Sequence, residues 1–174
     1  MNELKLSEKI KFLILLFTVG GIFGFIYETI FYYIDLGYLV KRGSTFGPWI
    51  PIYGFGALLI TLFTYKFKDH PLKVFLVTCL VTGLLELGTG YVLNTFFDIR
   101  LWDYNVEIWN FGNIGGYVCL RSILFFGISG LFLIYFLIPL FTKIKKKCNA
   151  RVFSLISIIP GVLFFSDFVA HIFL

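Results

Sequence analysis

Five long apolar runs constrain this chain more than any other feature. They extend over about Phe12–Ile34, Trp49–Tyr65, Leu72–Phe97, Ile114–Thr142 and Val152–Phe173. Runs of about 17 to 25 apolar residues match a hydrocarbon core about 30 Å thick. Only 14% of the residues are charged, whereas soluble domains carry about 25%. The sequence therefore predicts an all-α polytopic membrane bundle with five transmembrane helices.

The connections between these runs are short, so residues 1–174 are expected to form a single integral membrane domain with no soluble domain beside it. The first run is too long for the core of a cleavable signal peptide and has no small-residue cleavage site behind it. We therefore expect it to remain as a transmembrane helix of a multi-pass protein of the cell membrane.

The basic residues are distributed unevenly between the two sides of the predicted bundle. Three lie on one side, namely Lys41, Arg42 and Arg100. Eleven lie on the other side: Lys5, Lys9, Lys11, Lys66, Lys68, Lys73, Lys143, Lys145, Lys146, Lys147 and Arg151. Cytoplasmic loops carry the excess of Lys and Arg, so the amino terminus is predicted inside and the carboxyl terminus outside. The net charge of +5 is thereby explained by membrane orientation, and no nucleic-acid partner is expected.

The three cysteines show neither pairing nor metal-ligand spacing. Cys79 and Cys119 fall inside apolar runs, and Cys148 lies in the Lys143–Arg151 basic stretch. We expect three reduced thiols, no metal site and no cofactor.

Apart from Lys73 at the start of the third run, the acidic, basic and histidine residues inside the apolar runs are Glu28, Glu86, Arg121, Asp167 and His171. A charge at such depth costs several kcal/mol unless it is paired, protonated or facing water, so none of these side chains is expected to face lipid. The predicted topology places all five between about mid-membrane and the outer surface. We expect them to share one polar cavity there, with Arg42, Arg100 and Asp103 at its rim.

A buried ion network that joins the helices is the alternative interpretation of the same residues. Arg121 stays protonated under essentially all conditions and needs an anion nearby. Glu28 and Glu86 are the candidates, and Glu28 is the expected main partner because its estimated depth is closer to that of Arg121.

Two connections are unusual in composition. Lys41–Gly56 combines two prolines and four glycines with Trp49 and Tyr53, so it is either an interface turn between two helices or a ligand-facing loop. Its glycines are expected at positive φ or close-approach positions, which makes Gly47 and Gly54 intolerant of side chains. In the other connection, Asp98–Asn113, aromatic residues alternate with polar ones, as is typical of the headgroup boundary. The aromatic residues there are Trp102, Tyr104 and Trp109.

A set of motifs between Gly24 and about Gly127 resembles one known family, called putative ABC-transporter type IV or CmpB-like permeases. The motifs are Gly24-Phe-Ile-Tyr-Glu28, Arg42-Gly43, Gly47-Pro48-Trp-Ile-Pro51-Ile-Tyr53-Gly54-Phe-Gly56, Leu85-Glu86, Trp102-Asp103-Tyr104 and Asn110-Phe-Gly112-Asn-Ile114 with Ser122. Asn105 and Phe126 stand where the family pattern has serine and tryptophan. The resemblance implies an integral membrane protein with a role in transport.

The first functional interpretation is a permease subunit with a charged outer cavity that binds an unknown small-molecule or lipid substrate. Its candidate ligand-binding residues are Glu28, Arg42, Tyr53, Glu86, Asp103, Arg121 and Asp167. The chain has no Gly-xxxx-Gly-Lys-Ser/Thr phosphate loop, so a separate ATPase subunit would supply energy. Five helices are few for one permease, which favours a homodimer.

Two other classes stay open. A membrane enzyme at the outer face would use Glu28 or Glu86 as base and Arg42 or Arg121 to hold an anionic group. No catalytic motif of a known hydrolase or protease supports it, so the sequence favours a protein that is not an enzyme. A sensor or an assembly subunit without chemistry is the third class.

Overall fold

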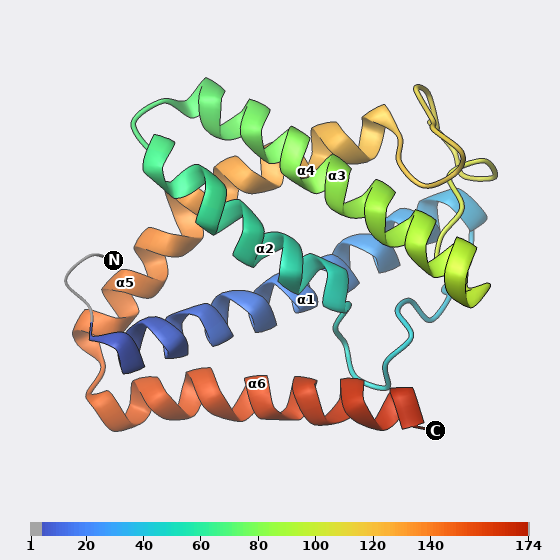
Figure 1. Ribbon diagram of the computed structural model, residues 1–174. Coiled ribbons are helices and arrows are strands. Elements are labelled where there is room, and N and C mark those ends of the chain that lie inside the picture. Colours follow the sequence, from blue (N-terminus) through green and yellow to red (C-terminus); the bar gives the residue numbers. More distant parts are fainter. Residues whose placement is uncertain (1–4, 174) are drawn as a thin grey trace. The chain divides into compact units, whose positions relative to one another are not determined.

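The computed structural model describes residues 5–173, and these residues are all helical apart from the connections and one isolated β-bridge. The elements in chain order are α1 (Leu6–Leu36), α2 (Pro51–Thr64), a 3-10 turn (Tyr65–Phe67), α3 (Pro71–Phe97), α4 (Leu120–Phe132), a π segment (Leu133–Leu137), α5 (Ile138–Lys147) and α6 (Ala150–Phe173). Figure 1 labels the six α-helices. The π segment joins α4 to α5, so Leu120–Lys147 is one continuous helical stretch and the helices number five in effect.

Four helices of the described chain are long and apolar enough to cross a membrane: Leu6–Leu36, Pro71–Phe97, Leu120–Lys147 and Ala150–His171. The prediction of an all-α, multi-pass membrane protein is confirmed at this level. The second predicted span differs, because α2 covers only Pro51–Thr64. Fourteen residues rise about 21 Å, which is less than the roughly 30 Å of a hydrocarbon core.

The helix predicted from Ile114 begins only at Leu120. Gly112, Gly115 and Gly116 have φ of +67°, +61° and +79°, a left-handed conformation that no α-helix contains. Ile114 and Val118 instead form the isolated antiparallel bridge. The prediction was wrong here because an apolar, glycine-rich stretch was assigned to the helix that follows it.

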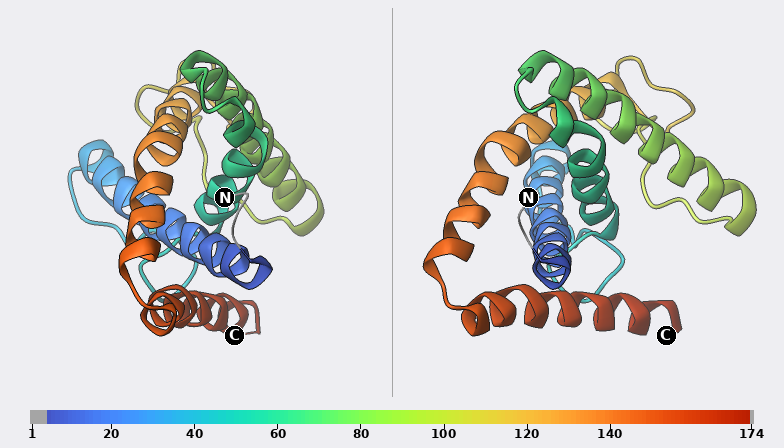
Figure 2. Two further views of the ribbon diagram at one scale, coloured as in Figure 1. Left: turned by 90° about the vertical axis from the view of Figure 1, so that its left-hand side faces the viewer. Right: turned by 60° about the vertical axis from the view of Figure 1, so that its left-hand side comes forward.

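The chain divides into two compact units. The terminal unit consists of the chain up to Leu58 together with the chain from Leu137, and the central unit is Leu59–Phe136. In the terminal unit α1 packs against α6; in the central unit α3 packs against α4 (Figure 2).

Glycines allow close packing within the terminal unit, as the Gly-rich stretch of α1 predicts. A Cβ on Gly20 would lie 2.8 Å from the Cβ of Ala57, and one on Gly24 would fall on the ring of Tyr53. Gly21 faces Phe164 of α6. These contacts bring α1 against both α2 and α6.

Two loops connect the long helices, and both begin at a residue in the left-handed conformation. Gly37, with φ +79°, ends α1 and donates its N–H to Tyr33 O. Asp98, with φ 55°, has the same left-handed conformation at the end of α3. The loops themselves are residues 37–50 and 98–119, and they carry most of the polar contacts described next.

Candidate functional site

Asp167 of α6 holds the 37–50 loop of the terminal unit. Its Oδ1 accepts the backbone N–H of Phe46 at 3.0 Å, and its Oδ2 accepts the N–H of Gly47 at 2.7 Å. The indole Nε1 of Trp49 donates to the same Oδ2 at 2.6 Å. Three donors converge on one carboxylate that lies about 120 residues away in sequence, an arrangement called here the Asp167 anchor.

The Asp167 anchor depends on a small residue at Gly47. A Cβ there would collide with the Trp49 ring and lie 3.0 Å from Asp167 Oδ2. Gly54 is similarly constrained, since its Cβ would lie 2.8 Å from Phe17. The predicted close approaches at Gly47 and Gly54 are therefore confirmed. The Trp49 ring also stacks on Phe164 at 5.0 Å between centroids, which fixes the indole donor in place.

A second polar contact of the terminal unit joins the same loop to α1. The Nη2 of Arg42 lies 2.9 Å from Glu28 Oε2, and its Nε donates to that oxygen at 3.0 Å. The Arg42 guanidinium also lies 3.5 Å from the centroid of the Tyr32 ring, a distance that suits a cation–π contact. The sequence predicts Arg42 at the rim of a cavity, and the structure pairs it with Glu28.

Tyr53, the remaining candidate of this unit, lies in the first turn of α2. Its ring covers Gly24 and has its centroid 6.3 Å from that of Tyr27. It therefore helps to pack α2 on α1 beside the segment that carries Glu28.

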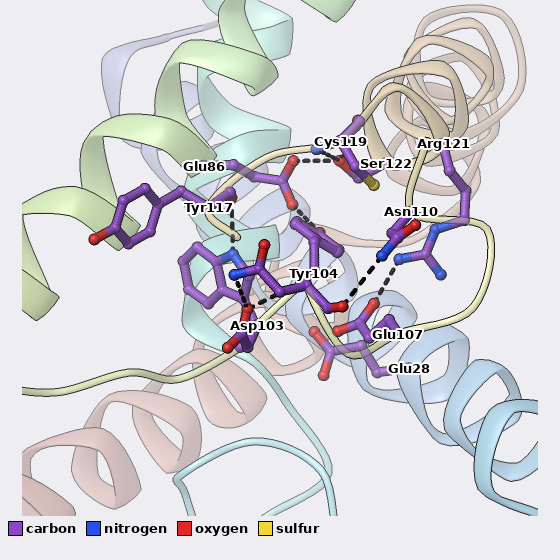
Figure 3. A network of polar contacts seen from close by, with 12 residues as sticks. Glu28, Glu86, Asp103, Tyr104, Glu107, Asn110, Tyr117, Cys119, Arg121 and Ser122 are labelled. Atoms are coloured by element: carbon purple, nitrogen blue, oxygen red, sulfur yellow. Dashed lines mark hydrogen bonds and ion pairs between the residues drawn. The ribbon is translucent and has the colours of Figure 1, made fainter. Parts of the chain in front are cut away.

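In the central unit, Glu86 of α3 is buried and accepts two hydroxyl hydrogen bonds. Tyr104 Oη donates to Oε1 at 2.5 Å, and Ser122 Oγ donates to Oε2 at 2.7 Å. Figure 3 shows the carboxylate between these two hydroxyl groups, one from the 98–119 loop and one from α4. We call this arrangement the Glu86 anchor.

The Tyr104 hydroxyl stays a donor under ordinary conditions. Burial, and next the negative charge of Glu86 and its hydrogen bond, raise the pKa of Tyr104 well above its usual value. A protonated hydroxyl suits a buried carboxylate, since charge-assisted bonds of this type are short.

Arg121 lies in the first turn of α4 and pairs with Glu107 of the loop. The Nη2–Oε2 distance is 2.5 Å, and the side chains are only 13% and 4% exposed. The Arg121 guanidinium also lies 5.3 Å from the Tyr104 ring centroid. The sequence placed Arg121 about seven residues into its helix; the later start of α4 puts it at the helix end. The expected pairing of Arg121 with Glu28 stays a prediction.

Asp103 organises the polar interior of the 98–119 loop. Its Oδ1 accepts from Arg100 Nη2 at 2.9 Å, from the Asn105 N–H at 2.9 Å and from Asn105 Nδ2 at 2.8 Å. Asn113 Nδ2 continues the chain of bonds to Asn105 Oδ1 at 2.7 Å. Asp103 is thus a loop-forming residue rather than an isolated rim charge.

Sequence reasoning found the carboxylates but missed several of their partners. Glu107 and Ser122 were not candidates, because one lies in a polar connection and the other is a common helix residue. Trp49 was assigned to the interface rather than to Asp167. One signal was present: Arg121 needs an anion, and Glu107 is the nearest carboxylate before it in sequence.

These helices define a multi-pass helical membrane protein in which carboxylates of long apolar helices hold the loops between helices. The family model described as "Putative ABC-transporter type IV" matches residues 15–172, and the chain belongs to this family. Neither the comparison with curated proteins nor the comparison with solved structures found a match.

Proposed function

We propose that this chain is the membrane subunit of an ABC-type transporter that moves a small molecule or a lipid. The observation that carries the proposal is the family match over residues 15–172 of a chain with four apolar candidate spans. A separate ATPase subunit supplies the energy, because the sequence has no phosphate-binding loop of its own.

The proposed topology has five membrane helices, with the amino terminus inside and the carboxyl terminus outside. The eleven-to-three distribution of basic residues supports it. The short α2 crosses with the help of its flanking segments, Trp49–Ile50 at one end and Tyr65–Phe67 at the other. Single cysteines in a cysteine-free background test the topology. A cysteine that replaces Asn105 should react with an impermeant thiol reagent applied outside, and one that replaces Lys146 should not. The opposite labelling would refute it.

Seven residues are proposed to contact substrate: Glu28, Arg42, Tyr53 and Asp167 in the terminal unit, and Glu86, Asp103 and Arg121 in the central unit. In each unit these residues are polar, and each set is proposed to lie in the outer half of the membrane. Support comes from the fixed positions of these groups, since hydrogen bonds and ion pairs hold each charged member in one orientation. Pre-oriented polar groups in an otherwise apolar wall are typical of small-molecule sites.

The cytoplasmic basic segments are proposed to dock the ATPase. They are Lys66–Lys73 and Lys143–Arg151, and in the second of these Lys146 and Lys147 are exposed. Lys145 is excluded from the test because its Nζ pairs with Glu8 at 3.1 Å.

The decisive experiment purifies the tagged full chain from its native membrane in nanodiscs and assays ATP hydrolysis. We expect an ABC ATPase subunit in stoichiometric amount, with hydrolysis lost when the lysine of that partner's phosphate loop is replaced. Lys146→Glu with Lys147→Glu should reduce the bound ATPase several-fold, whereas Lys41→Glu, on the other predicted side, should not. A chain that purifies without any ATPase at full yield would contradict the proposal.

A membrane enzyme that acts on a lipid or small molecule is the second candidate. The observation that favours it is the Ser122 hydroxyl 2.7 Å from the Glu86 carboxylate, a hydroxyl beside a base. Ser122→Ala with unchanged transport activity would separate the two candidates in favour of transport.

A further inference from the structure

The 98–119 loop is inverted in polarity relative to an ordinary surface loop. Six of its charged and amide side chains bond to partners within the central unit: Arg100, Asp103, Asn105, Glu107, Asn110 and Asn113. Arg100 pairs with Asp103 at 2.9 Å, and Asn113 donates to Asn105. Glu107 and Tyr104 are buried at 7% and 9% exposure. Most polar groups of this loop are therefore bonded to one another, and those that also reach the surface are Asp98, Arg100 and Asn105.

The exterior of the loop is nevertheless rich in large apolar side chains. The exposed large side chains are Ile99, Leu101, Val106, Trp109, Phe111 and Ile114, of which Val106 is 82% exposed. The apolar surface continues onto the end of α3, where Phe96 and Phe97 are 72% and 64% exposed. A connection in water normally presents polar groups outward, so this exterior fits an apolar environment.

Trp109 adds a separate observation. Its φ is 53°, a left-handed conformation that is a genuine outlier for a bulky residue. Trp109 is also 60% exposed, so its ring presents a large apolar face on the exterior of the loop.

The neighbouring helices indicate where the loop lies relative to the membrane. It connects α3 to the Leu120–Lys147 helical stretch, and both are candidate membrane spans. A segment between two spans lies where they leave the hydrocarbon core. Tryptophan is enriched at that boundary, where its ring contacts acyl chains and its N–H reaches water or headgroups.

We propose that the exterior of the 98–119 loop is a lipid-contacting surface, with Val106, Trp109 and Phe111 inserted at the boundary between headgroups and acyl chains. The inference goes beyond transport, since it assigns a partner to a surface rather than a role to the polar groups. It also distinguishes among the three aromatic residues of this loop that the sequence singles out. Trp102 donates its Nε1–H to Tyr117 O and Tyr104 binds Glu86, so Trp109 alone of the three aromatic residues is strongly exposed.

The test attaches a spin label to a cysteine at Val106 of the full chain, with the three native cysteines replaced, in phosphatidylcholine vesicles. Collision with oxygen, which concentrates in lipid, is compared with collision with a nickel chelate, which stays in water. Leu84, 61% exposed in the middle of α3, is the lipid control, and Lys146 is the water control. The proposal expects the label at Val106 to collide more with oxygen than with the chelate, between the two controls.

Two results would overturn the proposal. Chelate collisions equal to those at Lys146 would place Val106 in water. Low collision with both reagents, together with spin–spin broadening that disappears on dilution with unlabelled chain, would place it against a second copy.

A second measurement needs no change of the native cysteines. Brominated lipids quench the emission of tryptophans that reach the acyl region. The quenched fraction should fall clearly in Trp109→Phe relative to the unmodified chain. An unchanged fraction would again contradict the lipid contact.

Discussion

Each of the two loops that follow α1 and α3 is held by a carboxylate of its own from an apolar helix, but the groups that donate hydrogen bonds to the two carboxylates differ. Asp167 binds the 37–50 loop through two backbone N–H groups and one indole. Glu86 binds the 98–119 loop and α4 through two side-chain hydroxyls. A carboxylate in an apolar helix therefore tolerates substitution to a different degree depending on which groups donate hydrogen bonds to it.

All three donors of the Asp167 anchor are N–H groups, which can only donate. Each of them therefore needs an acceptor oxygen on residue 167. The Glu86 anchor is more adaptable. The Ser122 hydroxyl also lies 2.8 Å from Cys119 O, so it can donate there and accept from a different group. A hydroxyl is both donor and acceptor, whereas an N–H only donates.

The largest effect is expected at the second anchor of the 98–119 loop, the Arg121–Glu107 pair. Glu107→Gln removes the carboxylate 2.5 Å from a largely buried guanidinium, and breaking a buried pair costs about 3 to 5 kcal/mol. The free energy of unfolding in detergent measures it. The double variant Glu107→Leu with Arg121→Met should recover most of the loss. A loss below about 1 kcal/mol in the single variant would show that the pair is not buried in solution.

Gly47→Val should come next, because the 37–50 loop brings its backbone directly to the carboxylate. The new side chain collides with Trp49 and displaces Asp167, at a cost of about 3 kcal/mol from overpacking. Transport should be lost in parallel with thermal stability. Gly88→Val is the matched control, since a Cβ at Gly88 meets nothing within 4 Å. Equal melting temperatures for the two variants would contradict the close approach at Gly47.

The anchors are compared directly by replacing each carboxylate with its amide. Asp167→Asn places an NH2 group against at least one N–H donor, so we expect a loss of about 2 kcal/mol. Glu86→Gln should cost about 1 kcal/mol or less, because its NH2 group can donate to the Ser122 oxygen while Tyr104 keeps its acceptor. Both are read from the same denaturation curves. A larger loss for Glu86→Gln would reverse the comparison.

The smallest effect is expected for the exposed pair of the 98–119 loop. Arg100 and Asp103 are 35% and 31% exposed, and exposed ion pairs contribute about 0.2 to 1 kcal/mol. Arg100→Gln should therefore lower the melting temperature by only a few degrees at most. A loss as large as that of Glu107→Gln would mean that the loop depends on this pair more than its exposure indicates.

The sequence predicts the helices of this protein because long apolar runs determine them directly. It also identifies Glu28, Glu86 and Asp167 as residues that need partners, because a charge in an apolar run needs compensation. What the sequence does not reveal is which partner each one takes. Asp167 and Gly47 are 120 residues apart, and only the packing of α1 against α6 brings them together.

The helix boundary that was predicted wrongly, the start of α4, also depends on conformation that the sequence does not reveal. The start of α4 depends on the left-handed φ of Gly112, Gly115 and Gly116, and apolar composition carries no information about that conformation. Burial of Glu107 likewise follows from the fold of the loop, since its neighbours in sequence include exposed residues such as Val106.

The central claim is that carboxylates of the apolar helices hold the loops, and backbone amide exchange at the Asp167 anchor tests it most directly. Peptides that cover Ser44–Ile50 are followed by hydrogen–deuterium exchange in nanodiscs. Phe46 and Gly47 should be protected in the unmodified chain and exchange at least about tenfold faster in Asp167→Asn, which corresponds to about 1.4 kcal/mol of local stability. Glu8→Gln, which removes a partly exposed carboxylate that pairs with Lys145, should leave the exchange unchanged. Equal protection of Phe46 and Gly47 with Asp or Asn at position 167 would contradict the account.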